Sequence, residues 1–302
     1  MKKKFFILFI FFTFLFLFYP GENYYFKIFA DNRDLFFKGE IKKTINKVHL
    51  VYTNSLYQPS ISAQGAYIID LKTFTPLFEK NSKIKFIPAS TAKIITALVA
   101  YDVFGPNQVI EVKRVINEGR TMELKLNEKI TVENLLYGLL VHSANDAAYA
   151  LADAYGFEKF ISLMNKKAGD LKMSDSHFVD PAGLSEYNQY TTAYDLALAS
   201  RIFLKNQYLA KIVATKEIVI SDVDFRYYHH LTNVNRLLGK IQGLGGLKTG
   251  YTENAGENLV SFYKNNGWDY VIVVLKSQDR FEDTLTLINW LNENVKHADI
   301  LL

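Results

Sequence analysis

Short hydrophobic runs occur near both ends of the region that begins at about residue 58, and longer helix-like segments lie between them. Two of these runs, at 66–70 and 76–79, are separated by polar residues and predict a hairpin. Asn265-Asn-Gly267 is a strong turn signal between two later runs. In this second half of the chain, strands are predicted at 215–220, 247–251, 259–263 and 269–275.

The segments between these strands have helix start and stop signals. One predicted helix follows Pro88, runs over 90–104 and ends at Gly105-Pro106. Thr192-Ala-Tyr-Asp195 forms a capping box at the start of another, which runs to 204. Further helices are predicted at 131–140, 144–155, 157–168 and 281–294. Strands that flank a helical middle section predict an α/β (α+β) fold, with one antiparallel sheet assembled from both ends of the domain and covered by helices.

The first 21 residues differ from the rest. Three lysines at 2–4 precede an unbroken apolar run at 5–19, and Pro20-Gly21 closes it. This pattern is typical of a secretory signal, and the run is shorter than the ~20 residues that span a bilayer comfortably. No small-x-small cleavage site follows, so residues 1–21 are predicted to be a signal peptide or an N-terminal membrane anchor, and either exports the rest. Residues 22–56 are mixed in character and are predicted to be a tether to a domain at 57–302.

Composition narrows the possible chemistry. The 302 residues contain no cysteine, which excludes a thiol nucleophile, disulfides and thiolate zinc sites. The net charge of +4 is mild and would suit an anionic surface such as cell wall or lipid headgroups. No basic stripe with interleaved aromatic residues is present, so no nucleic-acid partner is expected. The six histidines lack His-x-x-x-His spacing, so we expect no metal and no cofactor.

Ser90-Thr-Ala-Lys93 opens an apolar helix and carries the clearest chemistry. Three residues make nearly one helical turn, so the hydroxyl and the amine project from one face. A lysine with a depressed pKa can act as the base that activates a serine. The simple alternative is that Ser90 caps the helix. Ser82-Lys-Ile-Lys85 has the same spacing, but Pro88 disfavours a helix through that stretch.

Two more clusters follow in the order that a Ser/Lys acyl-transfer site requires. Ser143-Ala-Asn145 precedes a helix, and with Asp146 it also fits a capping box. Lys248-Thr249-Gly250 follows a glycine-rich stretch, but Leu247 stands where a phosphate-binding loop needs glycine. The segment fits an edge strand, where a lysine and a hydroxyl would bind a carboxylate and Gly250 would let substrate backbone approach closely.

Together the three clusters resemble the motifs of penicillin-binding proteins and serine β-lactamases. Stretches at 88–97, 143–148, 190–195, 233–238 and 246–252 are similar to D-alanyl-D-alanine carboxypeptidases, the low-molecular-mass penicillin-binding proteins. The similarity runs from about residue 58 to 297. It implies a β-lactamase/transpeptidase-like fold, in which an antiparallel sheet flanked by helices adjoins an all-helical lobe and the active site lies between them. Residues 57–302 would then be a D,D-peptidase catalytic domain.

The resemblance also implies roles for particular residues. Ser90 would be the acylated nucleophile, Lys93 its base, and Ser143 the relay of a proton to the leaving D-alanine. Asn145 would position substrate, Lys248 and Thr249 would hold its carboxylate, and the backbone N–H groups of Ser90 and Tyr251 would form the oxyanion hole. We expect a neutral Lys93 that is partly desolvated and near a second cation, Lys248. No role is assigned to Asp180.

The implied activity is release of the terminal D-alanine from peptidoglycan stem pentapeptides, with β-lactams as covalent inhibitors. Three alternatives remain: a D,D-endopeptidase, a class A-like β-lactamase and a non-catalytic wall-binding module of the same fold. The β-lactamase is disfavoured because residues 177–183 contain no glutamate to position a water. Many relatives carry a β-rich second domain and a C-terminal membrane helix. No such segment follows the closing helix here, so membrane attachment is expected through the N-terminal segment.

Overall fold

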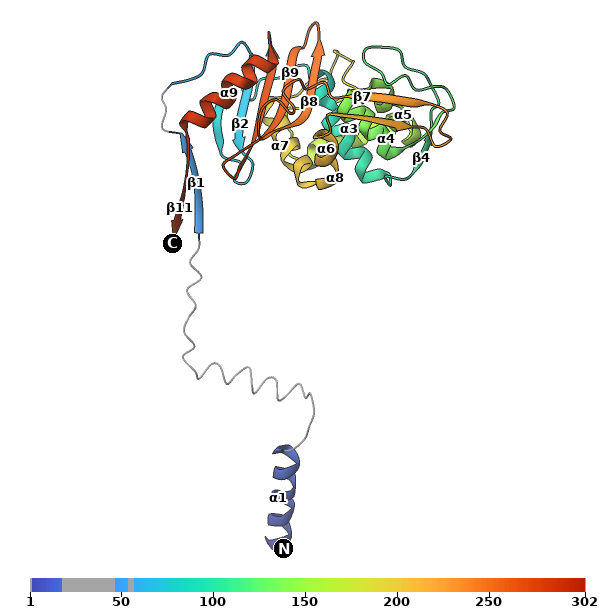
Figure 1. Cartoon of the computed structure of the whole chain (residues 1–302). Coiled ribbons are helices and arrows are strands. Elements are labelled where there is room, and N and C mark those ends of the chain that lie inside the picture. The colour runs from blue at the N-terminus through green and yellow to red at the C-terminus, as the bar shows by residue number, and fades with distance from the viewer. Residues whose placement is uncertain (1, 18–46, 54–56, 302) are drawn as a thin grey trace. The chain divides into compact units, whose positions relative to one another are not determined.

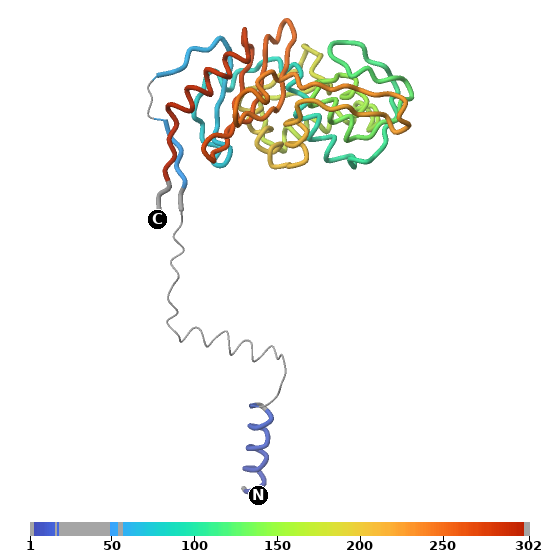
Figure 2. Tube along the Cα trace, in the orientation of Figure 1, coloured from blue at the N-terminus to red at the C-terminus, as the bar shows by residue number. Residues whose placement is uncertain are grey.

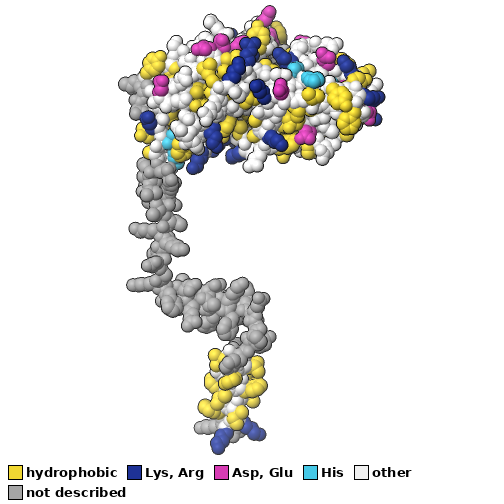
Figure 3. Space-filling model, viewed as in Figure 1, with side chains coloured by type: hydrophobic (Ala, Val, Ile, Leu, Met, Phe, Trp, Pro, Cys, Tyr) yellow, Lys and Arg dark blue, Asp and Glu magenta, His cyan; other side chains and the backbone are white. Residues whose placement is uncertain are grey.

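The computed structural model describes residues 2–17, 47–53 and 57–301. Its backbone contacts divide the chain into two units, Met1–Val48 with Asp299–Leu302, and His49–Ala298. In the first unit, helix α1 spans Lys2–Leu17 and exposes a series of phenylalanine and other apolar side chains (Figure 3). Among the described helices, none has both the length and the apolar character that a membrane crossing requires.

A five-stranded antiparallel sheet forms the centre of the second unit. Its strands, in the order β3-β2-β10-β9-β8, come from both ends of that unit, as predicted (Figure 2). The strands are β2 (Gly65–Asp70), β3 (Pro76–Lys80), β8 (Leu244–Thr252), β9 (Gly256–Asn265) and β10 (Trp268–Ser277). Strand β2 pairs with β10 with Ile68 opposite Ile272, so residues about two hundred positions apart in sequence become neighbours. The predicted fold class is confirmed, and β8 lies at an edge of the sheet.

Helices cover both faces of the sheet (Figure 1). Alternate residues of a strand point to opposite faces, so Ile69 joins the core beneath α3 (Lys93–Val103) and α7 (Ala193–Lys205). Ile68 joins the core beneath α9 (Arg280–Asn294). Burial on both faces explains why the central strands are nearly continuous hydrophobic runs.

A mainly helical lobe packs beside the sheet (Figure 1). Its helices are α4 (Val132–Tyr137), α5 (Asn145–Tyr155), α6 (Phe157–Asp170) and α8 (Gln207–Val213). Two small hairpins accompany them, β4 (Val109–Glu111) with β5 (Lys129–Thr131) and β6 (Glu217–Ser221) with β7 (Tyr228–Thr232). The helices predicted at 144–155, 157–168, 192–204 and 281–294 are all present to within two residues.

The structure differs from the predicted elements in several places. The helix expected from Ser90 begins at Lys93, because a short 3₁₀ segment, η1 (Ala89–Ala92), precedes it. The helix expected over 131–140 ends at Tyr137 and continues as a wider turn, η2 (Gly138–His142). Strand β1 (Lys47–Thr53) lies within the expected tether and pairs with β11 (Val295–Leu301). The remaining tether residues, and residues 1 and 18–21 of the N-terminal segment, lie outside the described residues.

Candidate active site

Ser90 and Lys93 face each other where η1 passes into α3. Side chains three residues apart eclipse in a 3₁₀ segment, so this local geometry aligns the two groups. Lys93 Nζ donates to Ser90 Oγ at 2.7 Å. The competing Ser82 does not contact a lysine in this way. Its hydroxyl donates to Glu79 at 2.8 Å instead.

Contacts to the helical lobe hold the Lys93 amine in place. Its Nζ also donates to Asn145 Oδ1 at 2.6 Å and to the carbonyl of Ala182 at 3.0 Å. The side chain is completely buried, and this burial lowers the pKa of Lys93 to about 7, although the charges of Asp180 and Asp146 oppose the shift. Burial is therefore the main cause, rather than a neighbouring cation. A neutral amine beside a serine hydroxyl can accept its proton.

Ser143 and Lys248 form a second hydroxyl–amine pair. Lys248 Nζ donates to Ser143 Oγ at 2.8 Å and to the carbonyl of Thr249 at 3.0 Å. Ser143 ends η2 in the left-handed region, at φ 63°, and Ala144 takes the capping position of α5 without a side-chain hydrogen bond. The capping interpretation of Ser143 is therefore wrong, because its hydroxyl faces the lysine.

The pKa of Lys248 lies well below its usual value. Burial is the largest cause, followed by the positive charges of Lys93, Arg280 and Arg120. An anion entering this region would meet the positive charges of Arg280 and Arg120, and its own negative charge would favour the protonated form of the buried Lys248. The electrostatics therefore favour a bound carboxylate.

Strand β8 approaches the start of η1 closely at Gly250. A Cβ atom at this position would lie 3.0 Å from the carbonyl oxygen of Pro88 and 3.1 Å from the amide nitrogen of Ser90. Asn258 on the neighbouring strand β9 holds the start of η1 in place by donating from Nδ2 to the carbonyl oxygen of Pro88 at 3.1 Å. Tyr251, the next residue on β8, is 60% exposed. Glycine at 250 thus lets strand β8 and the backbone of Ser90 meet.

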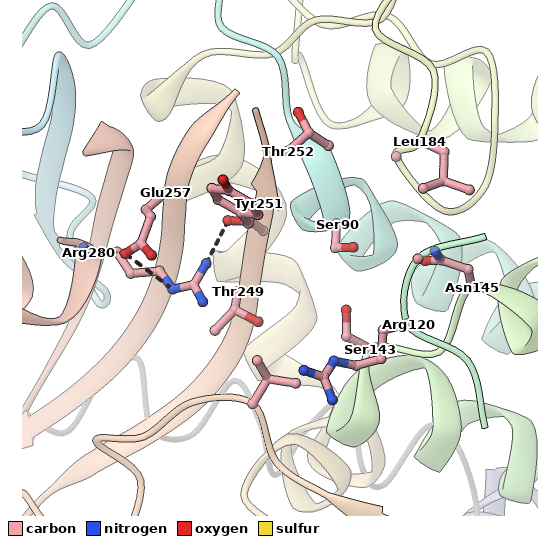
Figure 4. A pocket seen from close by; sticks show the side chains of 14 residues that line it. Ser90, Arg120, Ser143, Asn145, Leu184, Thr249, Tyr251, Thr252, Glu257 and Arg280 are labelled. Carbon is pink, nitrogen blue, oxygen red and sulfur yellow. Dashed lines mark hydrogen bonds and ion pairs between the residues drawn. The ribbon is translucent and has the colours of Figure 1, made fainter. Parts of the chain in front are cut away.

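These groups line one pocket of about 350 Å³. Figure 4 shows the side chains of Ser90, Ser143 and Thr249 around a common space, with Asn145 to the right of Ser90 in this view. Of the eight site residues predicted from the sequence, Ser90, Ser143, Asn145, Thr249, Gly250 and Tyr251 line this pocket. Lys93 and Lys248 contact its lining through the hydrogen bonds described above.

Two arginines of this pocket were not predicted from the sequence. Arg280 donates from Nη1 to the carbonyl of Gly250 at 2.8 Å, and Arg120 lies near Ser143 and Thr249 (Figure 4). The carbonyl of Arg120 also accepts from the amide of Asn145 at 2.7 Å. No local sequence pattern identifies either arginine, since each reaches the site through tertiary packing.

Asp180 was given no role from the sequence, yet it organises the loop that contacts Lys93. Its Oδ1 accepts hydrogen bonds from the amides of Ala182, Gly183 and Leu184, at 2.7 to 3.1 Å. Its Oδ2 accepts from the Ser185 amide at 2.6 Å and from a side-chain nitrogen of Gln189 at 3.0 Å. This network sets the position of the Ala182 carbonyl, so Asp180 is a positioning residue. An Asp-x-x-Gly turn is the available sequence signal.

A two-lobed α+β domain with two hydroxyl–lysine pairs at its junction defines the class of serine D,D-peptidases and penicillin-binding proteins. Comparison with known proteins is more specific, because the profile of the D-alanyl-D-alanine carboxypeptidase family matches residues 52–279. The chain belongs to this family. It is 32% identical over 222 residues to D-alanyl-D-alanine carboxypeptidase DacF of Bacillus subtilis, covering 70% of this chain and 57% of DacF.

Solved structures agree with this assignment. The D-alanyl-D-alanine carboxypeptidase of Mycobacterium tuberculosis superposes with a TM-score of 0.75 at 28% identity, covering 80% of this chain and 96% of that one. A Streptomyces DD-transpeptidase superposes with a TM-score of 0.73 at 29% identity, covering 78% of this chain and 98% of that one. The chain spans only 57% to 66% of the length of the carboxypeptidases DacF and DacD.

Proposed function

We propose that this protein is a serine-type D-alanyl-D-alanine carboxypeptidase that removes the terminal D-alanine from peptidoglycan stem pentapeptides. The observation that carries the proposal is the 2.7 Å contact between Ser90 Oγ and a buried Lys93 amine with a pKa of about 7. Such an amine is largely neutral at slightly alkaline pH and can deprotonate the hydroxyl. Membership of the D-alanyl-D-alanine carboxypeptidase family supports this substrate class.

In the proposed acylation, Ser90 Oγ attacks the carbonyl carbon of the penultimate D-alanine while its proton passes to Lys93 Nζ. The backbone N–H groups of Ser90 and Tyr251 bind the oxygen that becomes negative, and each such donor is worth roughly 3 to 4 kcal/mol. The C–N bond then breaks, and Ser143 relays the proton that Lys93 took from Ser90 to the departing amine of D-alanine, which leaves Lys93 neutral again. Water afterwards hydrolyses the ester on Ser90 and releases the shortened peptide.

The remaining groups orient the substrate. Thr249 and Lys248 would bind the terminal carboxylate, and the positive charges of Arg280 and Arg120 in the same pocket would add to the attraction for this anion. Asn145 accepts from Lys93 through Oδ1 and donates to the carbonyl of Glu118 through Nδ2, and these contacts fix its position. It would thereby orient the base Lys93 and also contact the substrate backbone. Fixing these groups before substrate arrives lowers the entropic cost of the reaction.

We further propose that residues 1–21 export the domain to the outer face of the cytoplasmic membrane, the periplasm or the cell wall, as a cleaved signal or as an anchor. Three lysines followed by an apolar run support export. Mass measurement of the mature protein from the cell envelope tests this assignment. An intact, unprocessed chain in the cytosolic fraction would contradict it.

The activity is tested by mass spectrometry of a synthetic stem pentapeptide after incubation with the protein. Wild type should release one D-alanine, Ser90→Ala should release none, and Ser82→Ala should behave like wild type because it alters the other Ser-x-x-Lys sequence. A fluorescent penicillin should label wild type and Ser82→Ala persistently but not Ser90→Ala. Cleavage of a cross-linked dimer without cleavage of the pentapeptide would instead indicate an endopeptidase, and rapid loss of the penicillin label a β-lactamase.

A further inference from the structure

Two histidines and an aspartate meet at the end of the sheet near strands β1 and β11. His49 lies on β1, His297 on β11, and Asp70 at the end of β2. One ring nitrogen of each histidine and one carboxylate oxygen of Asp70 lie within 4.8 Å of one another. None of the three lines the active-site pocket. The cluster therefore has chemistry that the proposed peptidase reaction does not use.

The Asp70 carboxylate is buried with one oxygen unsatisfied. The residue is only 1% exposed, and its Oδ1 accepts from the amide and the hydroxyl of Thr73, each at 2.7 Å. Among the described residues, Oδ2 has no hydrogen-bond partner. Leaving a carboxylate oxygen buried and unpaired is costly, and buried charges in proteins are usually paired or bound to a metal. A cation would supply the missing interaction.

Neighbouring aromatic residues fix the orientation of both imidazoles. The Trp268 indole stacks on His49 with ring centroids 4.0 Å apart and on His297 with centroids 4.1 Å apart. The Tyr270 hydroxyl lies 2.5 Å from Nε2 of His297, and Tyr270 is directly opposite Asp70 in the sheet. When His297 Nε2–H donates to the Tyr270 oxygen, Nδ1 of the same ring carries a lone pair, which accepts from His49 Nε2 in the hydrogen bond between the two rings. Such outer hydrogen bonds are typical of histidines that bind metals.

We propose that His49, His297 and Asp70 form a binding site for a divalent transition-metal ion, with Zn²⁺ as the best match. Two imidazoles and one carboxylate suit zinc, whereas calcium and magnesium prefer sets made only of oxygen ligands. His49 Nε2 and His297 Nδ1 are 3.0 Å apart and share a hydrogen bond, so a bound ion would take the place of the proton between them. Tetrahedral zinc needs roughly 3.3 Å between two ligand nitrogens, so these two atoms need to separate only slightly. Water would fill the fourth position.

The bound ion would join three segments that are distant in sequence. It would connect β1 and β11 to the end of β2, and thus hold the first and last strands of the domain against the central sheet. Metal binding would therefore stabilise this end of the domain without entering the peptidase mechanism.

The test uses tag-free, full-length protein that has been freed of metal with a chelator. Co²⁺ is the spectroscopic probe, because tetrahedral cobalt absorbs strongly in the visible range, and Zn²⁺ is then added as competitor. Asp70→Asn keeps an oxygen for Thr73 but removes the charge, and His49→Gln and His297→Gln each remove one nitrogen ligand. His230→Gln is the matched control, since His230 is exposed on β7.

Wild type and His230→Gln should bind one Co²⁺ per chain, and one equivalent of Zn²⁺ should displace it. Each cluster variant should bind Zn²⁺ at least about 10- to 100-fold more weakly. The unfolding temperature of wild type should rise by roughly 5 to 10 °C at a zinc concentration one hundred times the dissociation constant. Equal zinc affinity in His297→Gln and wild type, or no saturable binding by wild type, would overturn the proposal. Penicillin labelling of Ser90 should persist in all variants, so this test is independent of the peptidase assignment.

Discussion

The rate at which Ser90 is acylated should increase with pH and then level off just above neutrality. Lys93 can accept a proton only when it is neutral, and its pKa is about 7. It is therefore roughly one-tenth neutral at pH 6 and nine-tenths neutral at pH 8, which predicts about a tenfold increase between these two values. A lysine with the usual pKa of 10.5 would give about a hundredfold increase over the same interval and would not level off.

The size of the shift in the pKa of Lys93 follows from its burial. A shift of the Lys93 pKa from 10.5 to about 7 corresponds to roughly 5 kcal/mol favouring the neutral amine. The side chain is completely buried, so bulk solvent does little to screen this effect. Asp180 and Asp146 oppose it, and without them the shift would be larger.

Stopped-flow measurement of acylation by a fluorescent penicillin, from pH 5.5 to 9.5, tests this prediction. The carboxylate of the penicillin remains ionised throughout, so the profile reports on the enzyme. Return of each sample to pH 7.5 should restore the original rate and thereby exclude loss of folded protein. A rate that climbs through pH 9 without levelling, or one that does not change between pH 6 and 8, would show that a neutral Lys93 is not the base.

Three substitutions extend the test. Gly250→Ala should slow acylation at least tenfold in a folded protein, because the new methyl group comes within 3.1 Å of the Ser90 amide nitrogen and must displace backbone. Stopped-flow rates within twofold of wild type would refute this prediction. Asp180→Asn should lower the free energy of unfolding in urea by roughly 2 to 3 kcal/mol, because one acceptor oxygen is lost. It should also move the acylation midpoint below pH 7, since Asp180 raises the pKa of Lys93, and an upward movement would contradict this. Thr192→Ala should cost about 1 kcal/mol of stability by removing the cap of α7, with acylation unchanged; a slower acylation would argue against a purely structural role.

Local patterns predicted most of the regular structure because burial imposes a period on the sequence. The strand predicted at 269–275 is the centre of β10, which is buried on both faces and thus continuously hydrophobic. The capping signal at Thr192 is confirmed, since its hydroxyl accepts from the amide of Asp195. Asp195 itself accepts from Ser176 and from the amide of Asp175, so its role is tertiary rather than the reciprocal half of a capping box.

Elements that are short or depend on distant partners were not predicted. Helix α8 has seven residues and follows α7 after a single residue, Asn206, which caps it, so the two look like one segment in sequence. Strand β1 pairs with β11, which lies about 250 residues later in the sequence. No motif predicts that His49 and His297 lie together. The His-x-x-x-His spacing detects metal ligands on one helix, not ligands from two strands that are distant in sequence.

The two serines of the proposed active site lie where regular structure is interrupted, which explains why capping and catalytic interpretations competed in the sequence. Ala89 and Ser143 both adopt positive φ, at 46° and 63°, a conformation that costs a non-glycine residue on the order of 1 to 2 kcal/mol. Ala89 immediately precedes Ser90, the proposed nucleophile, and Ser143 carries the second hydroxyl of the pocket. Had α5 begun with Ser143 as a conventional cap, its hydroxyl would bond to the helix backbone and could not face Lys248. The arrangement that brings the two serines to the two buried lysines therefore costs free energy, both as local backbone strain and as burial of amines. The packing of the sheet against the helical lobe offsets this cost.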